Sequence, residues 1–439
     1  MITKRKTDRL PAMSSASNDP KIQERCQRTR IFKTRESLLT IILEGRNGKA
    51  IYNVFPGIFL LGMLYSALKD YQREGRPYFG TRLLRSSFAQ FDVAAMIWIP
   101  MFGSCLLVYF FFALWKQGRQ QTKWKCQWDK LFVSVFGLYV LVLPHLVAFV
   151  TVSNNLGPAS SLAVMLEMVR LLMKSYAFVR SNTKSLEHKQ GGLCPSFSHY
   201  LYFLFAPTLI YSDNYPRTNK IRWSCIAISF AEITAIILLH SVLVENTYVY
   251  YLQNYGKRSY SFLEIITCIV ECAFSGHVSL IMIFYSFHSY FNATAELTRF
   301  SDRLFYLDWW TAENLDEFLR GWSYFVHEWL HVYIYRDCHE ILFPSRKLLA
   351  KIVVLVLSGY FHDLILCVAS RTFLPLTIIE FVSFVWMRVF LTNKMILGLL
   401  GMEVSCAFTI LMMEYYARLN CPMPNAGVIQ YLMPRFLYC

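Results

Sequence analysis

A histidine and an aspartate, His362 and Asp363, interrupt an apolar run over 348–370 that is long enough to cross a bilayer. Ionisable groups are costly to place there, so we take such a pair as a functional candidate. A low-dielectric surrounding favours the neutral imidazole, which can act as a general base. Ser358 precedes it by one turn on the same helix face. The alternative is a histidine that only packs and hydrogen-bonds.

A polar stripe precedes this run. Over 314–335 the large apolar side chains recur at spacings of three and four, which predicts one amphipathic helix on the cytosolic side. A second face of that helix carries Arg320, Ser323, His327, His331 and Tyr335. This face is either a solvated surface or the lining of a polar path.

A cation also lies at a suitable distance from the histidine. Lys347 precedes His362 by fifteen residues, about 22 Å along a helix. A cation at the membrane surface and a base at depth suit a long anionic molecule such as a coenzyme A thioester. Its phosphates would contact Lys347 and Arg320, while His362 takes the proton of an attacking alcohol. The stripe would supply a donor to the developing oxyanion.

A competing motif lies on the same predicted helix. The five residues 327–331 read His-Glu-Trp-Leu-His, which matches the HExxH pattern of zinc proteases. An intramembrane zinc protease is therefore an alternative. A third ligand would have to be Asp337, His339 or Asp363, and none of these lies in a recognisable third-ligand motif. We expect no metal site.

The composition indicates a membrane protein. Of 439 residues, 55% are hydrophobic and only 17% charged. The net charge of +15 comes from the N-terminal segment and from loops between apolar runs, which is typical of cytosolic loops and does not indicate nucleic-acid binding. We predict an all-α bundle of about nine spans at 51–68, 93–115, 131–153, 156–173, 224–244, 265–291, 348–370, 373–391 and 395–413.

The chain ends and the remaining polar residues complete the prediction. Residues 1–35 have the composition of a disordered basic cytosolic tail, followed by one membrane domain over 36–439 that begins with a short surface helix at 36–44. Glu167 and Arg170, three residues apart, predict an intramembrane ion pair, or alternatively part of a water-filled site. Cys421 and Cys439 lie beyond the last run, where a lumenal disulfide is plausible.

The residues Phe305, Tyr306, Asp308, Trp309 and Trp310 form an aromatic block that resembles the signature of the membrane-bound O-acyltransferases, in the branch of sterol and diacylglycerol acyltransferases. His362 with Asp363 resembles the catalytic His-Glu of that branch. Further stretches resemble the sterol type: 202–211, 215–218, 292–303 and 421–439.

This resemblance implies a homodimer or homotetramer in the endoplasmic reticulum membrane, among membrane lipids, that esterifies sterol with long-chain acyl-CoA. Acyl-CoA would be a co-substrate, with no permanently bound cofactor. It implies His362 as general base and a disulfide between the two C-terminal cysteines. The residues that match the lining of the family's coenzyme A tunnel are Arg320, His327, Tyr335, Lys347 and Ser358.

Four positions depart from the family pattern. Asp363 replaces a glutamate, and Asn53 stands where the sterol enzymes often carry a histidine near the acceptor path. Thr311 stands where the signature ends in asparagine, and Ser323 stands where an asparagine assists the histidine. A serine hydroxyl can still donate one hydrogen bond, so we keep Ser323 as a catalytic candidate. The alternatives left open are another lipid alcohol as acceptor, such as diacylglycerol, and a weakly active relative that binds lipid.

Overall fold

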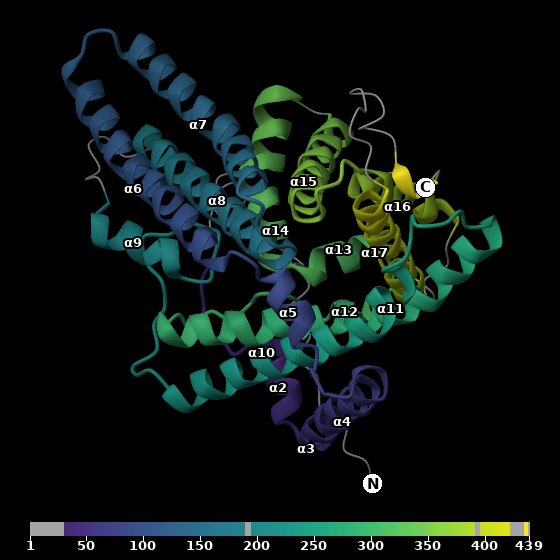
Figure 1. Ribbon diagram of the computed structural model, residues 1–439. Coiled ribbons are helices and arrows are strands. Elements are labelled where there is room, and N and C mark those ends of the chain that lie inside the picture. The colour runs from purple at the N-terminus through teal and green to yellow at the C-terminus, as the bar shows by residue number, and fades with distance from the viewer. Residues whose placement is uncertain (1–29, 189–194, 345, 391–395, 422–433, 438–439) are drawn as a thin grey trace.

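The computed structural model describes residues 30–188, 195–344, 346–390, 396–421 and 434–437. Over these ranges the chain is helical and contains two isolated β-bridges but no strand (Figure 1). The predicted all-α membrane fold is therefore confirmed. Six helical segments of the described part are long and apolar enough to cross a membrane: Arg46–Glu74, Thr81–Gln121, Lys125–Ser153, Trp223–Leu252, Phe262–Leu297 and Lys347–Ser370.

The three remaining apolar runs also coincide with helices. They are α8 (Pro158–His188), α16 (Leu376–Phe390) and α17 (Ile396–Asn420). Helix α8 carries several charged residues, and α16 has only 15 residues, which is short for a span. The count of nine spans stays a prediction.

One half of the bundle surrounds α8. Helices α6 (Phe91–Gln121) and α7 (Lys125–Ser153) pack on each other and on α8, and α15 (Lys347–Ser370) packs on α8 from the other side. The short α9 (Phe197–Phe205) lies against α6 and α8. Their buried apolar and aromatic side chains form the largest core cluster, and packing in this cluster positions α15.

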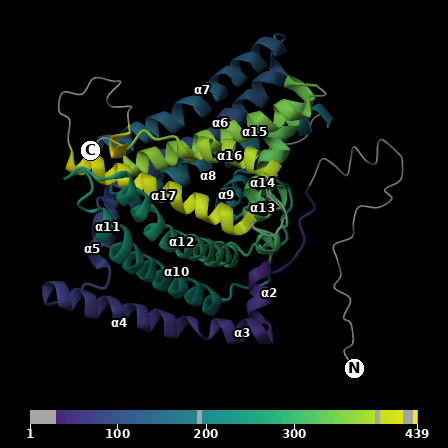
Figure 2. The same cartoon turned by 90° about the vertical axis from the view of Figure 1, so that its right-hand side faces the viewer.

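The other half is built on one long helix. Helix α12 (Phe262–Leu297) packs against α10 (Trp223–Val244) on one side and α17 on the other, as Figure 2 shows. Helix α4 (Phe55–Glu74) lies outside α10. Smaller elements join these helices: α2 (Leu38–Glu44), α3 (Arg46–Tyr52), α5 (Thr81–Ser87), η1 (Glu245–Val249), α11 (Tyr250–Leu252) and η5 (Arg435–Leu437).

The polar residues of α8 bind the bundle together. Glu167 and Arg170 form an ion pair of 2.6 Å, and Arg170 also donates to the carbonyl of Leu204 at the end of α9. The fully buried Lys174 donates to three carbonyls there, those of Phe203, Leu204 and Ala206. A cation at a helix C-terminus satisfies carbonyls that lack intrahelical partners. This arrangement matches the structural interpretation of the predicted pair.

Residues 30–35, which the composition assigns to a disordered tail, are docked on the bundle in the structure. Arg35 donates its backbone N–H to the carbonyl of Ser301, and the N–H of Arg303 donates to the carbonyl of Arg35. Arg30 and Arg35 of this segment form ion pairs with the buried carboxylate of Asp302. Composition alone cannot identify that partner. Residues 1–29 lie outside the described residues.

Candidate active site

His362 lies on α15, one turn after Ser358, as predicted. Its Nδ1 is 2.7 Å from the carbonyl oxygen of Ser358. A carbonyl oxygen can only accept, so Nδ1 carries the hydrogen and the neutral ring keeps its lone pair on Nε2. The side chain is exposed, with its ring against Phe381 at a centroid distance of 6.1 Å. Protein atoms leave the ring accessible to a substrate, and its desolvation by the membrane stays a prediction.

Asp363 is turned away from this histidine and has a different task. Its buried carboxylate accepts the backbone N–H groups of Thr377 at 2.7 Å and Ile378 at 3.1 Å. These are orphan donors of the first turn of α16, which a carboxylate stabilises both by hydrogen bonding and by its charge. In this structure Asp363 caps the next helix, and a catalytic role for it beside His362 stays a prediction.

The polar stripe does not lie on one continuous helix. The chain forms α13 (Leu315–Trp322) and α14 (Tyr324–Trp329), and then two π-helical segments, η3 (Leu330–Tyr335) and η4 (Cys338–Leu342). The break falls at Ser323, which has non-helical backbone angles, φ −136° and ψ 71°. The predicted single helix is wrong at this residue.

Hydrogen bonds to the aromatic block cause this break. In a continuous helix the N–H of Phe325 would donate to the carbonyl of Gly321. Instead, Gly321 accepts from the N–H of Leu307 at 2.9 Å, and Phe325 donates to the carbonyl of Phe305 at 3.3 Å. A side chain at position 321 would place its Cβ 3.1 Å from the Cβ of Trp309, so glycine permits this close approach.

The aromatic block is a support for α13 and α14. Phe305 and Tyr306 are buried, and Trp309, at the start of η2 (Trp309–Thr311), packs edge-on against Trp322 and Phe284. Tyr306 shares a 2.5 Å hydrogen bond with Nδ1 of His288 on α12. Asp308 is exposed, and its carbonyl accepts from the hydroxyl of Thr311, the residue that replaces the family asparagine.

Further along the stripe, three rings stack. His331 lies on Tyr335 at 5.2 Å, and Tyr335 lies on His339 at 5.9 Å, with nearly parallel planes. The wider turn of a π-helix brings residues four apart into line, which explains the ladder. Helix α15 packs against both π-helical segments. Arg320 and Lys347, the two predicted phosphate contacts, are both exposed.

The histidines of the stripe provide hydrogen bonds and not charge. Burial lowers the pKa of His327 to about 4, helped by His331 and Arg320. Burial also lowers the pKa of His331, helped by Arg336. Both rings are therefore neutral near pH 7. The positive charge for an anionic ligand has to come from Arg320 and Lys347.

The HExxH pattern does not form a metal centre in the part of the chain that the structure describes. Glu328, which would act as the base of a zinc protease, forms an ion pair with Arg30. Among the described residues, no three His, Cys, Asp or Glu side chains come close enough to bind a metal ion. The protease alternative has no support in this geometry.

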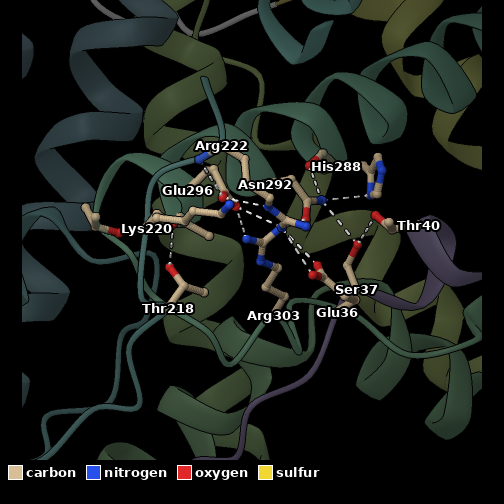
Figure 3. A network of polar contacts seen from close by, with 12 residues as sticks. Glu36, Ser37, Thr40, Thr218, Lys220, Arg222, His288, Asn292, Glu296 and Arg303 are labelled. Atoms are coloured by element: carbon tan, nitrogen blue, oxygen red, sulfur yellow. Dashed lines mark hydrogen bonds and ion pairs between the residues drawn. The ribbon is translucent and has the colours of Figure 1, made fainter. Parts of the chain in front are cut away.

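Sequence reasoning missed a network of charged residues behind the aromatic block (Figure 3). Arg303, buried two residues before Phe305, forms ion pairs with Glu296 on α12 and with Glu36. Arg222 contacts the same two carboxylates at 2.8 and 3.1 Å. In the sequence, the stretch 292–303 stands out for its family resemblance. Its many polar residues at a helix end are the signal that could have indicated this network.

The same network includes the asparagine of a glycosylation sequon. Asn292 is buried, donates to Ser37 at 3.2 Å and to the carbonyl of His288 at 2.8 Å, and so joins α12 to the residue before α2. Its amide is occupied inside the protein. This geometry fits an unmodified asparagine.

The predicted disulfide lies at the edge of the described residues. Cys421 is disulfide-bonded. Cys439 lies outside the described residues, so the pairing of the two stays a prediction.

Comparison with known proteins shows the family of this chain. The profile of the membrane-bound O-acyltransferase family matches residues 85–418, and the chain belongs to that family. It is thus a membrane-embedded acyltransferase.

Its relatives include sterol O-acyltransferase 2 of Mus musculus, which is 32% identical over 99% of this chain and 85% of the relative. The human sterol O-acyltransferase 2 is 32% identical over 98% of this chain and 83% of the relative. Mouse sterol O-acyltransferase 1 is 31% identical over 93% and 79%, respectively.

Proposed function

We propose that this chain transfers a long-chain acyl group from acyl-CoA to the hydroxyl of a sterol, with His362 as general base. The observation that carries the proposal is the hydrogen bond from Nδ1 of His362 to the carbonyl of Ser358. It leaves the basic nitrogen, Nε2, on an accessible side chain. The sterol acceptor is supported by the relatives of this chain, which are sterol O-acyltransferases.

In this mechanism Nε2 of His362 removes the proton of the sterol hydroxyl as its oxygen attacks the thioester carbonyl. The C–S bond then breaks, and the imidazolium returns the proton to the departing thiolate. No proton is gained or lost overall. Ser323, at the break between α13 and α14, is the candidate donor to the oxyanion.

The acyl-CoA would lie along α15. Its phosphates would meet the charges of Arg320 and Lys347, while the neutral ring of His327 and the hydroxyl of Tyr335 would donate and accept hydrogen bonds. Helix α15 is continuous from Lys347 to Ser370, so Lys347 and His362 keep a separation of about 22 Å. Ser358 lies between them and is part of the same proposed path.

The cellular setting is part of the proposal and rests on the family resemblance. We propose the endoplasmic reticulum membrane as the location and a homodimer or homotetramer as the assembly. Acyl-CoA acts as a co-substrate, with no permanently bound cofactor.

The test is ester formation in microsomes from cells that lack their own sterol acyltransferase. Labelled oleoyl-CoA is supplied with cholesterol or, in parallel, with diacylglycerol. Steryl ester from the wild type and none from His362→Ala would support the proposal. Ester with diacylglycerol alone would show that the acceptor is not a sterol but another lipid alcohol. No ester with either acceptor, despite bound acyl-CoA, would support the alternative that this chain is a weakly active relative that binds lipid.

A further inference from the structure

Arg30 makes a buried contact that neither the family resemblance nor the proposed reaction accounts for. Its side chain is 7% exposed and forms ion pairs with Asp302, at 3.3 Å, and with Glu328. The guanidinium also lies over the rings of Phe32, at 4.8 Å, and Tyr324, at 5.9 Å. One arginine therefore joins the start of the docked chain to the loop before the aromatic block and to α14.

Helix α14 depends on such contacts. It has six residues, begins directly after the break at Ser323, and has no side-chain cap at its N-terminus. A helix this short is not stable by itself. Its other supports include the bond from Phe325 to the aromatic block and the bond from Trp329 to the carbonyl of Met173 on α8. Phe325 and Trp329 also pack edge-on against Phe291 and Tyr176. The ion pair of Arg30 with Glu328 adds a further contact.

We propose that Arg30 is a positioning residue of the acyltransferase site, which fixes α14 and thereby Ser323 and His327 against the acyl-CoA path. His327 is the neighbour of Glu328 in sequence, and Ser323 is the residue from which α14 starts. Movement of α14 would displace both. This inference rests on the proposed function, because it takes α14 as a wall of the acyl-CoA path.

Charge around Glu328 gives the inference a specific signature. The charged and titratable groups that face this carboxylate are Arg30, Arg35, Asp302, Tyr324 and Tyr333. Burial raises the pKa of Glu328, and the charge of Arg30 opposes that rise. Burial and the charge of Asp302 both raise the pKa of Glu328. Without Arg30 less positive charge opposes them, so the carboxylate of Glu328 becomes protonated at a higher pH.

The test compares Arg30→Ala with Arg35→Ala in the full-length chain. Arg35 is the matched control, since it contacts Asp302 but its side chain is 32% exposed and makes no ion pair with Glu328 among the described contacts. Initial rates with oleoyl-CoA and cholesterol are measured from pH 6 to pH 8.5. We expect Arg30→Ala to lower kcat/KM about tenfold, mainly through KM for oleoyl-CoA. We expect Arg35→Ala to stay within about twofold.

The pH profile separates positioning from a general loss of folding. The acidic limb of the Arg30→Ala profile should move to higher pH, and the added substitution Glu328→Gln should remove that movement. Arg30→Lys should give an intermediate KM, because an ammonium group lacks the planar fork that meets two carboxylates. If Arg30→Ala does not fold, Glu328→Gln alone breaks the same ion pair and should raise KM in the same way.

Unchanged KM and pH profile in folded Arg30→Ala would overturn the inference. So would an equal loss in Arg35→Ala, since that would indicate general docking of the segment. If the wild type forms no steryl ester, the proposed function fails; the dissociation constant of non-hydrolysable oleoyl-CoA then becomes the readout. A tenfold weaker constant in Arg30→Ala supports the inference, and an equal constant overturns it.

Discussion

The carbonyl oxygen of Gly321 accepts its hydrogen bond from Leu307 and not from Phe325, the residue four positions later in the same segment. This exchange of partners interrupts the hydrogen bonds along the helix at one place, and the aromatic block supplies the replacement bonds. The block thereby sets the angle between α13 and α14. The residue at that angle is Ser323, the candidate donor of the site.

Gly321→Ala should disturb this junction. The new methyl group would lie 3.1 Å from the Cβ of Trp309, and overpacking of this kind costs about 1–3 kcal/mol. We expect a lower midpoint of thermal unfolding in detergent and reduced acyl transfer. Gly103→Ala on α6 is the control, because its new Cβ would meet open space. Equal midpoints for both variants would contradict the assignment.

Substitutions at His362 and Asp363 should separate activity from stability. His362→Ala should lower kcat by about 10²–10⁴, the usual contribution of a general base, with unchanged thermal stability. Acyl transfer by the purified protein and its unfolding midpoint are the measurements. A fall in stability as large as the fall in activity would count against the role of His362 as base.

Asp363→Ala should show the opposite pattern. Loss of the cap on Thr377 and Ile378 should destabilise the protein by about 0.5–2 kcal/mol. Asp363→Asn keeps one acceptor oxygen and should recover part of that loss. The effect on kcat should be much smaller than that of His362→Ala. If Asp363→Asn abolishes turnover while the fold stays intact, the carboxylate has a catalytic task that the geometry does not show.

Ser323 can be tested by returning the family residue. Ser323→Ala should lower kcat by about 10², the effect of losing one oxyanion donor. Ser323→Asn should restore or exceed wild-type turnover, because an amide reaches further than a hydroxyl. Ser323→Thr keeps the hydroxyl and serves as the control for local shape. Wild-type turnover in Ser323→Ala would remove this residue from the mechanism.

The partly buried His327 should make the protein sensitive to acid. The pKa of His327 is about 4 in the folded state and near its ordinary value of about 6.5 in the unfolded state. Between these values the unfolded state binds more protons, so the free energy of unfolding falls as the pH is lowered from about 6.5 to about 4. His327→Asn should flatten this dependence in thermal unfolding measured across that window. If the free energy of unfolding of His327→Asn depends on pH as steeply as that of the wild type, His327 does not cause the acid sensitivity.

The sequence was sufficient for the features that depend on local patterns. Apolar runs predicted the positions of the helices, and spacing along α15 placed Lys347, Ser358 and His362 correctly on one element. The break at Ser323 was not predictable in this way, because the apolar positions keep a helical period through it. Its cause is a pair of backbone bonds to Leu307 and Phe305, which periodicity does not register. The capping role of Asp363 was hidden for the same reason.

The docked segment at the start of the chain also has a consequence for biosynthesis. Arg30 and Arg35 find Asp302 only after about 270 further residues have been made, so both arginines emerge long before their partner exists. Closing so long a loop is entropically unfavourable and is a late event in folding. Until it happens, Asp302 and Glu328 lack these counter-charges. We therefore expect residues 30–35 to dock late, so that newly made protein passes through a stage in which α14 lacks the ion pair of Glu328 with Arg30.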